Sequence, residues 1–123
     1  MKVLLVDDSD FILERMKEVI SEVPCIKQIS STNNVVDFMN LLNEKNPDIV
    51  LLDIIMPHKT GIEILKEIKQ SYSAIIVIMV TNYATDHYQS ICLENGAAYF
   101  IDKSTEFEMI PEILENICSS YSN

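Results

Sequence analysis

The segment KVLLVDDSDF, residues 2–11, decides the fold, because four consecutive apolar residues lead directly into two acids. The apolar run Val3–Val6 predicts a strand buried on both faces, as the inner strands of parallel sheets are. A helix cap needs only one side chain, and Ser9 and Asp10 already offer one. The adjacent acids Asp7 and Asp8 therefore indicate a site at the end of this strand.

Strand-like and helix-like segments alternate along the rest of the chain, judged by the spacing of their apolar residues. The predicted later strands are Cys25–Ser30, Ile49–Leu52, Ile75–Val80 and Ala98–Ile101. The predicted helices are Phe11–Val23, one that starts at Asn33 or Asn34 and ends at Asn46-Pro47, Gly61–Gln70, Ala84–Glu94 and roughly Glu106–Cys118. Two starts remain open for the last helix, because Pro111 belongs in a first turn whereas Ser104 or Thr105 is the better cap.

Five strands that alternate with five helices predict an α/β fold, a doubly wound parallel sheet with helices on both faces. Right-handed crossovers leave few topologies. The uninterrupted apolar first strand suits the centre of the sheet, which favours the flavodoxin-like (βα)5 arrangement with strand order 2-1-3-4-5. In such sheets the ligand lies at the carboxyl ends of the strands, where the winding direction reverses.

Composition narrows the class of protein. The 123 residues fit one domain, residues 1–123, and an apolar content of 48 % suits one sizeable core. The formal charge of −10 argues against direct binding of nucleic acid or of an anionic membrane. No apolar run approaches the length of a membrane span, and the first residues do not resemble a signal peptide. We therefore expect a soluble cytoplasmic protein without membrane insertion.

The cysteines give no sign of a metal site. Cys25, Cys92 and Cys118 are odd in number and far apart, and they fit no metal-ligand spacing. We expect three free thiols, buried or half-buried, in a reducing compartment.

Polar residues follow four of the predicted strands. Asp7 and Asp8 end the first strand, Asp53 the third, Thr81 the fourth and Lys103 the fifth. Two carboxylates about 4 Å apart repel by roughly 4 kcal/mol at an effective dielectric constant of about 20, so such a cluster raises its pKa values or holds a cation. Oxygen ligands suit Mg²⁺, with Mn²⁺ as the alternative. A divalent ion, a carboxylate, a hydroxyl and an amine are what phosphoryl transfer to a carboxylate requires.

Four stretches together resemble the receiver domain of two-component response regulators. They are LLVDDSDF, DIVLLDIIMPHKTGIEIL, IIVIMVTNYA and GAAYFIDKS, in the usual order and spacing. The acidic pair, the Asp-x-x-Met-Pro-x-x-x-Gly motif, the threonine and the lysine form a specific set. The resemblance covers the whole chain and is greatest to stand-alone regulators of the chemotaxis type.

The resemblance implies a phosphorylation site with a metal. Asp53 would accept the phosphoryl group. Asp8 would bind Mg²⁺ directly, Asp7 would bind it directly or through water, and Asp53 and the backbone carbonyl of Ile55 would complete the protein ligands.

The resemblance also implies a switch. Lys103 would contact the phosphoryl group and its acceptor, and Thr81 would move to hydrogen-bond a phosphoryl oxygen. Phe100 would then turn inward as the switch aromatic. Met56-Pro57 and Gly61 would shape the loop behind the acceptor.

A histidine kinase or a histidine phosphotransfer protein would supply the phosphoryl group in a phosphorelay, and a downstream protein would receive the signal. The fourth helix, fifth strand and fifth helix would form the contact surface, near the tyrosines Tyr83, Tyr88 and Tyr99. Asp102 and Glu106 would meet basic residues of the partner. The chain would be no enzyme beyond catalysing its own phosphorylation and dephosphorylation.

Departures from the family pattern affect the loop after Lys103, access to the phosphoryl group and self-dephosphorylation. Ser104 replaces the usual proline after Lys103, where the family's peptide bond is commonly cis; a cis bond here would cost about 2.5–4 kcal/mol, so we expect a strained peptide or a different loop. Asn82 replaces a small residue and narrows access to the phosphoryl group. Ile55 and Tyr83 are poor at orienting water, so we expect slow self-dephosphorylation.

Three other functions fit the same residues less well. A pseudo-receiver without phosphorylation is disfavoured by the intact acids and Lys103. A flavin or nucleotide binder on this fold would need a glycine-rich phosphate loop after the first strand, which is absent. A metal-dependent aspartate phosphatase would need an Asp-x-Asp spacing that Asp7-Asp8 does not give.

Overall fold

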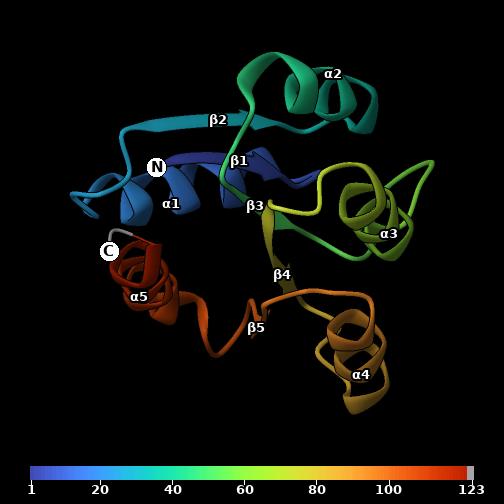
Figure 1. The fold of residues 1–123 in the computed structure, drawn as a ribbon. Coiled ribbons are helices and arrows are strands. Elements are labelled where there is room, and N and C mark those ends of the chain that lie inside the picture. Colours follow the sequence, from blue (N-terminus) through green and yellow to red (C-terminus); the bar gives the residue numbers. More distant parts are fainter. Residues whose placement is uncertain (122–123) are drawn as a thin grey trace.

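Residues 1–121 are described by the computed structural model and form a five-stranded parallel sheet covered by helices on both faces (Figure 1). The strand order β2-β1-β3-β4-β5 confirms the predicted topology. The strands are β1 (Lys2–Val6), β2 (Gln28–Thr32), β3 (Ile49–Leu52), β4 (Ile76–Thr81) and β5 (Tyr99–Asp102). The helices are α1 (Asp10–Ser21), α2 (Val35–Lys45), α3 (Gly61–Ser71), α4 (Asp86–Glu94), the short 3-10 helix η1 (Phe107–Met109) and α5 (Ile110–Tyr121).

Different helices cover the two faces of the sheet. Alternate residues of a strand point to opposite faces, so Val3 and Leu5 join the apolar cluster under α1 and α5. Leu4 and Val6 join the cluster under α2, α3 and α4. All four side chains are at most 1 % exposed, as a central strand requires. Figure 1 shows α1 and α5 on one side of the sheet and the other three helices across from them.

Side-chain caps fix where the first four helices begin. The side chains of Ser9, Asn34, Thr60 and Thr85 each accept a backbone N–H in the first turn of α1, α2, α3 and α4. The predicted start of α4 at Ala84 is therefore two residues early, since Thr85 is the cap and the helix begins at Asp86.

Several other boundaries shift by one or two residues, and two starts, those of the second strand and the last helix, differ by more. The second strand starts at Gln28 rather than Cys25, because a turn intervenes in which the Ile26 amide donates to the Val23 carbonyl. The last helix uses neither Ser104 nor Thr105 as its cap: η1 comes first, α5 begins at Ile110, and Pro111 lies in its first turn as expected.

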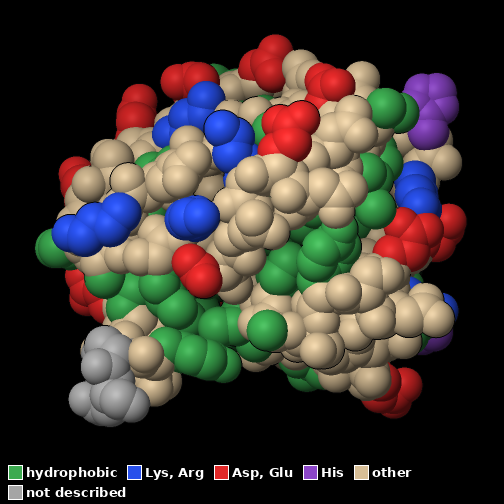
Figure 2. All heavy atoms as spheres, turned by 45° about the horizontal axis from the view of Figure 1, so that its top comes forward, with side chains coloured by type: hydrophobic (Ala, Val, Ile, Leu, Met, Phe, Trp, Pro, Cys, Tyr) green, Lys and Arg blue, Asp and Glu red, His purple; other side chains and the backbone are tan. Residues whose placement is uncertain are grey.

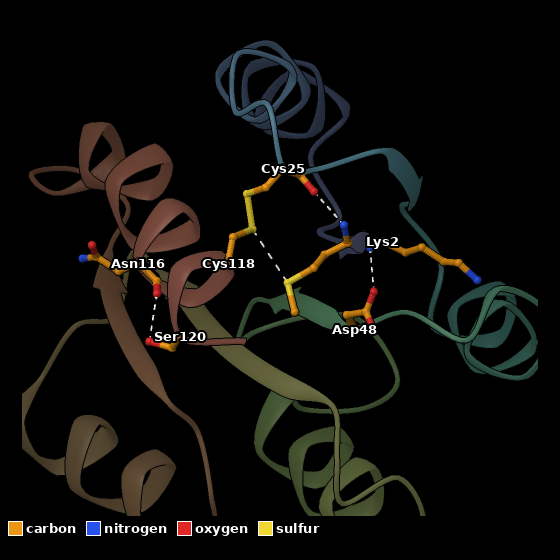
Figure 3. Close-up of a disulfide and its surroundings, with 7 residues drawn as sticks. Lys2, Cys25, Asp48, Asn116, Cys118 and Ser120 are labelled. Carbon is orange, nitrogen blue, oxygen red and sulfur yellow. Dashed lines mark hydrogen bonds between the residues drawn. A yellow bond between two sulfur atoms is a disulfide. The ribbon is translucent and has the colours of Figure 1, made fainter. Parts of the chain in front are cut away.

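The prediction of three free thiols is wrong for two of the cysteines. Cys25, in the turn after α1, forms a disulfide with Cys118 of α5, and the pair is 93 residues apart in sequence (Figure 3). Only Cys92 is free, buried in the cluster under α4. Sequence spacing could not reveal this pairing, because the fold alone brings the end of α1 beside α5.

The acidic side chains on one face of the molecule are scattered rather than gathered in a single patch. On the face shown in Figure 2, acidic side chains lie scattered around the outline, with hydrophobic side chains between them. No helix among residues 1–121 has both the length and the apolar composition needed to cross a bilayer.

Candidate functional site

The carboxyl ends of the strands bring the predicted site residues to one edge of the sheet. Asp7 and Asp8 directly follow β1, and Asp53 directly follows the neighbouring strand β3. Thr81 is the last residue of β4, and Lys103 follows β5. The adjacent strands β1 and β3 thus supply all three acids.

The three carboxylates form one cluster. Asp7, Asp8 and Asp53 each offer an oxygen, and these atoms all lie within 4.8 Å of one another. The Asp7 and Asp53 side chains are buried, with relative exposures of 1 % and 7 %, whereas Asp8 is exposed. The cluster is therefore enclosed by protein on one side and open to solvent at Asp8.

Lys103 connects the two buried carboxylates. Its ammonium nitrogen donates to Asp7 Oδ2 at 2.5 Å and to Asp53 Oδ2 at 2.9 Å. The lysine side chain is itself buried, so solvent screens these contacts little. The predicted convergence of the acids and the lysine is what the structure shows.

Backbone amides orient the second oxygen of each buried acid. The Ile54 amide donates to Asp53 Oδ1 at 2.7 Å, and the Ser9 amide donates to Asp7 Oδ1 at 2.9 Å. The Oδ2 atoms thereby face Lys103. The roles of these two amides could not be predicted from the sequence. Every residue except proline has a backbone amide, so no sequence pattern identifies the amides that bind the acids.

Burial and pairing compete in setting the pKa values. Burial raises the pKa of the Asp7 carboxyl, although hydrogen bonds from Lys103 and the Ser9 amide act against it. Burial opposes the charged form of Lys103, but its hydrogen bonds to Asp7 and Asp53 outweigh burial and raise its pKa. One ammonium thus shares a site with three carboxylates, which leaves an excess of negative charge that a cation would neutralise.

The donor set fits a hard divalent cation. The available side-chain ligands are carboxylate oxygens within reach of one another, with no sulfur and no imidazole among them. Such a set suits Mg²⁺ or Mn²⁺, ions that bind few protein oxygens and keep several waters. Asp8 is exposed and lies where such an ion would meet solvent.

The loop behind Asp53 is packed tightly against the start of α3. The Gly61 amide donates to the Ile54 carbonyl at 2.7 Å, and a Cβ atom at Gly61 would lie 1.8 Å from the Asp53 carbonyl oxygen. Only glycine allows the backbone at position 61 to lie so close to the Asp53 carbonyl. Within the loop, His58 adopts a left-handed conformation with φ of 75°, where many proteins would place glycine.

Thr81 is the last residue of β4 at this edge, and Phe100 lies in the neighbouring strand β5. The Thr81 hydroxyl is fully buried and accepts a hydrogen bond from the Tyr83 amide at 3.0 Å. Phe100 is half-buried against the cluster under α2, α3 and α4. Tyr83 and Ile55, expected near the hydrolytic water, are 53 % and 41 % exposed.

Of the two expectations for the segment after Lys103, a strained cis peptide or a different loop, the structure shows the different loop. No peptide bond among residues 1–121 is cis, so the bond to Ser104 is trans. The Ser104 amide donates to Asp102 Oδ1 at 2.8 Å, and the Asp102 amide donates to Glu106 Oε1 at 2.9 Å. Both acids proposed to meet a basic partner therefore also stabilise their own turn.

Comparison with known proteins agrees with this geometry. The sequence profile of the response regulator receiver domain matches residues 3–115. The chain belongs to the receiver domain family. Receiver domains act in two-component signalling, where they interact with histidine kinases and downstream targets, and they generally bind Mg²⁺.

The relatives of this receiver differ in length. It is 34 % identical to the probable C4-dicarboxylate response regulator DctR of Bacillus subtilis over 93 % of this chain, but spans only 50 % of DctR. It is 28 % identical to the chemotaxis protein CheY of Halobacterium salinarum, covering 97 % of this chain and 98 % of CheY. The chain thus spans about half of DctR and nearly all of CheY.

Solved structures show the same fold. The response regulator domain of Thermotoga maritima CheB superposes with a TM-score of 0.83 at 31 % identity, covering 97 % of this receiver and 94 % of that chain. The five-stranded sheet and its helices are therefore those of known receiver domains.

Proposed function

We propose that this receiver accepts a phosphoryl group on Asp53 from a phosphohistidine donor and passes the signal on by protein contact. The observation that carries the proposal is the convergence of Asp53, Asp7, Asp8 and Lys103 within hydrogen-bonding or ligand distance. Asp7, Asp8 and Asp53, with the backbone carbonyl of Ile55, would hold Mg²⁺ or Mn²⁺. When bound, such an ion neutralises charge on the phosphoryl oxygens.

Asp53 is suited to attack because one of its oxygens is fixed. The Ile54 amide holds Oδ1, so the carboxylate cannot rotate freely. A carboxylate oxygen would attack phosphorus in line as the phosphorus–nitrogen bond of the phosphohistidine breaks, and the electron pair of that bond returns to the imidazole. The product is an acyl phosphate on Asp53.

Lys103 and Thr81 would stabilise that product. The Lys103 ammonium already touches Asp53 Oδ2 and would follow the new negative charge onto the phosphoryl oxygens. The Thr81 hydroxyl, bound to the Tyr83 amide in this structure, would exchange that partner for a phosphoryl oxygen. Phe100 would then turn inward, into the space that Thr81 leaves.

The output surface would consist of α4, β5 and α5. Among its tyrosines, Tyr83 is exposed, whereas Tyr88 and Tyr99 are half-buried against the core. The donor would be a histidine kinase or phosphotransfer protein of the cytoplasm, and the receiver would catalyse only its own phosphorylation and dephosphorylation.

Phosphotransfer profiling against the histidine kinases of the source organism tests the proposal. The receiver, its Asp53→Asn variant and an Asp37→Asn control, which removes an exposed acid of α2, are mixed with each phosphorylated kinase in Mg²⁺. We expect at least one kinase to label the receiver and the control, but not Asp53→Asn. Labelling of Asp53→Asn at the normal rate would show that Asp53 is not the acceptor.

A further inference from the structure

The disulfide ties the end of α5 to the turn that follows α1. Cys25 lies in the turn between α1 and β2, and Cys118 lies in the last turns of α5, with their Cα atoms 6.3 Å apart (Figure 3). The Cα separation lies in the range that disulfides span without moving the backbone. The same corner holds Met1, whose backbone nitrogen donates to the Cys25 carbonyl and whose sulfur lies 3.7 Å from Cys118 Sγ.

The bridge borders the apolar cluster under α1 and α5, because the Cys118 side chain is buried and the half-buried Cys25 packs against that cluster. On this face α5 is anchored by Ile110, Ile113, Leu114 and Ile117, all at most 7 % exposed. The cluster that they join contains neither Cys25 nor Cys118 among its buried members. Apolar packing by these four side chains therefore holds α5 against the sheet in addition to the covalent bridge.

A surface hollow opens beside the bridge. Its volume is about 420 Å³, and it is lined by Pro24, Cys25, Glu115, Cys118 and Ser119. Both sulfur-bearing residues thus border a space large enough for a small organic molecule. Cys92 has no such access, because its side chain is fully buried under α4.

The last turns of α5 are thinly packed on their other side as well. A second hollow of about 170 Å³ separates them from β4 and β5, lined by Ile76, Ala98, Tyr99, Ile117, Ser120 and Tyr121. Tyr121 is 64 % exposed. The last turns of α5 thus have a hollow on each side, and the covalent bridge adds to the packing of Ile117 in holding this end of the helix.

We propose that Cys25 and Cys118 form a reversible redox site that small thiols and disulfides of the glutathione class reach through the hollow, and that reduction loosens the end of α5. The proposal does not depend on phosphorylation of Asp53. Where the receiver signals through α5, the bridge would add a redox input to that surface.

Two molecules of a small thiol are sufficient to reduce the Cys25–Cys118 bridge. A small thiolate attacks one sulfur of the bridge, the sulfur–sulfur bond breaks, and the other cysteine leaves as a thiolate. A second small thiolate then attacks the small-molecule sulfur of the mixed disulfide, the bond from that sulfur to the cysteine breaks, and the cysteine leaves as a thiolate. Two small thiols are oxidised to one disulfide, and the protein takes up their two electrons and two protons. The reverse reaction closes the bridge.

A redox titration of the folded protein tests the proposal. The receiver is equilibrated with reduced and oxidised glutathione at a series of ratios, acid-quenched, alkylated and analysed by peptide mass spectrometry. We expect Cys25 and Cys118 to open together without denaturant, whereas Cys92 is alkylated only after unfolding. Amide exchange at the end of α5 should become about tenfold faster on reduction, while that of α3 stays unchanged.

Two variants complete the test. Cys118→Ser should show fast exchange at the end of α5 in every buffer, and Cys92→Ala should titrate like the unmodified protein. The proposal fails if the bridge opens only in denaturant, if both cysteines are free in the most oxidising buffer, or if opening leaves exchange in α5 unchanged. Should Cys118→Ser fail to fold, the titration of the unmodified chain still decides.

Discussion

Lys103 is the residue on which the chemistry of the site depends, because its ammonium joins acids from two different strands. A buried ion pair adds little net stability, since removing the charges from water costs about as much as their attraction returns. Three acids around one buried lysine are thus explained better by function than by folding. Burial raises the pKa of the Asp7 carboxyl, and a cation bound beside it would favour its charged form.

Replacing the lysine should slow phosphorylation without abolishing the acceptor. For Lys103→Met we expect labelling by acetyl phosphate in Mg²⁺ to slow by about 10²-fold, the usual effect of removing one group that stabilises transition-state charge. The exposed Lys66→Met of α3 serves as the control and should label normally. Equal rates for both variants would remove Lys103 from the mechanism.

The residues around the acyl phosphate should make its hydrolysis slow. Ile55 and Tyr83 are largely exposed and carry no carboxylate or amide to orient water. We expect a half-life of many minutes or longer for the phosphorylated receiver in Mg²⁺, measured by loss of radiolabel. Tyr83→Gln should shorten it severalfold, whereas Tyr121→Gln, at the far end of α5, should not. A half-life of seconds in the unmodified receiver would contradict this expectation.

At the scale of elements, the β3–α3 loop holds the acceptor against the start of α3. Its contact depends on the missing side chain of Gly61, since a Cβ there would overlap the Asp53 carbonyl. The second glycine, Gly96, is needed for a different reason: its φ is +100°, and an added Cβ would meet only the flexible side chain of Lys69 at 3.0 Å.

These two glycines therefore predict different outcomes. Gly61→Ala should destabilise the receiver by about 3 kcal/mol, the upper end of what overpacking usually costs, and should reduce labelling of Asp53. Gly96→Ala should cost about 1–2 kcal/mol from backbone strain alone and leave labelling intact. Chemical denaturation and acetyl phosphate labelling measure both effects. Normal labelling of a folded Gly61→Ala would show that the loop contact is dispensable.

The disulfide should contribute to stability as well as to any redox response. It closes a long loop, with 93 residues of sequence separation, and so restricts the unfolded chain. We expect the double variant Cys25→Ser, Cys118→Ser to be less stable by about 2–5 kcal/mol in urea denaturation under oxidising conditions. Under reducing conditions the double variant and the unmodified protein should be nearly equal. A difference that persists after reduction would assign the loss to packing instead.

Across the receiver as a whole, the features that could be predicted from the sequence are those that depend on local residue pattern or on position along the sheet. The bounds of β3 at Ile49–Leu52 match because the strand is a short apolar run between two acids, Asp48 and Asp53. The meeting of Asp7, Asp53 and Lys103 was predictable because parallel strands end at one edge.

The features that were not predicted depend on contacts between residues distant in sequence or on backbone groups. The amides of Ser9 and Ile54 orient the acids whatever their side chains are. The pairing of Cys25 with Cys118 requires knowing that the end of α1 lies beside α5. The start of α4 was misplaced because one of several adjacent polar residues, Thr85, acts as its cap.

Trapping the phosphorylated residue tests the central claim most directly. The receiver is phosphorylated with acetyl phosphate in Mg²⁺ and treated with borohydride, which reduces an acyl phosphate to an alcohol, and its peptides are then sequenced by mass spectrometry. We predict a homoserine at position 53 alone, and none when Mg²⁺ is removed by a chelator. A modified residue elsewhere, or equal modification without the metal ion, would contradict the account of this site.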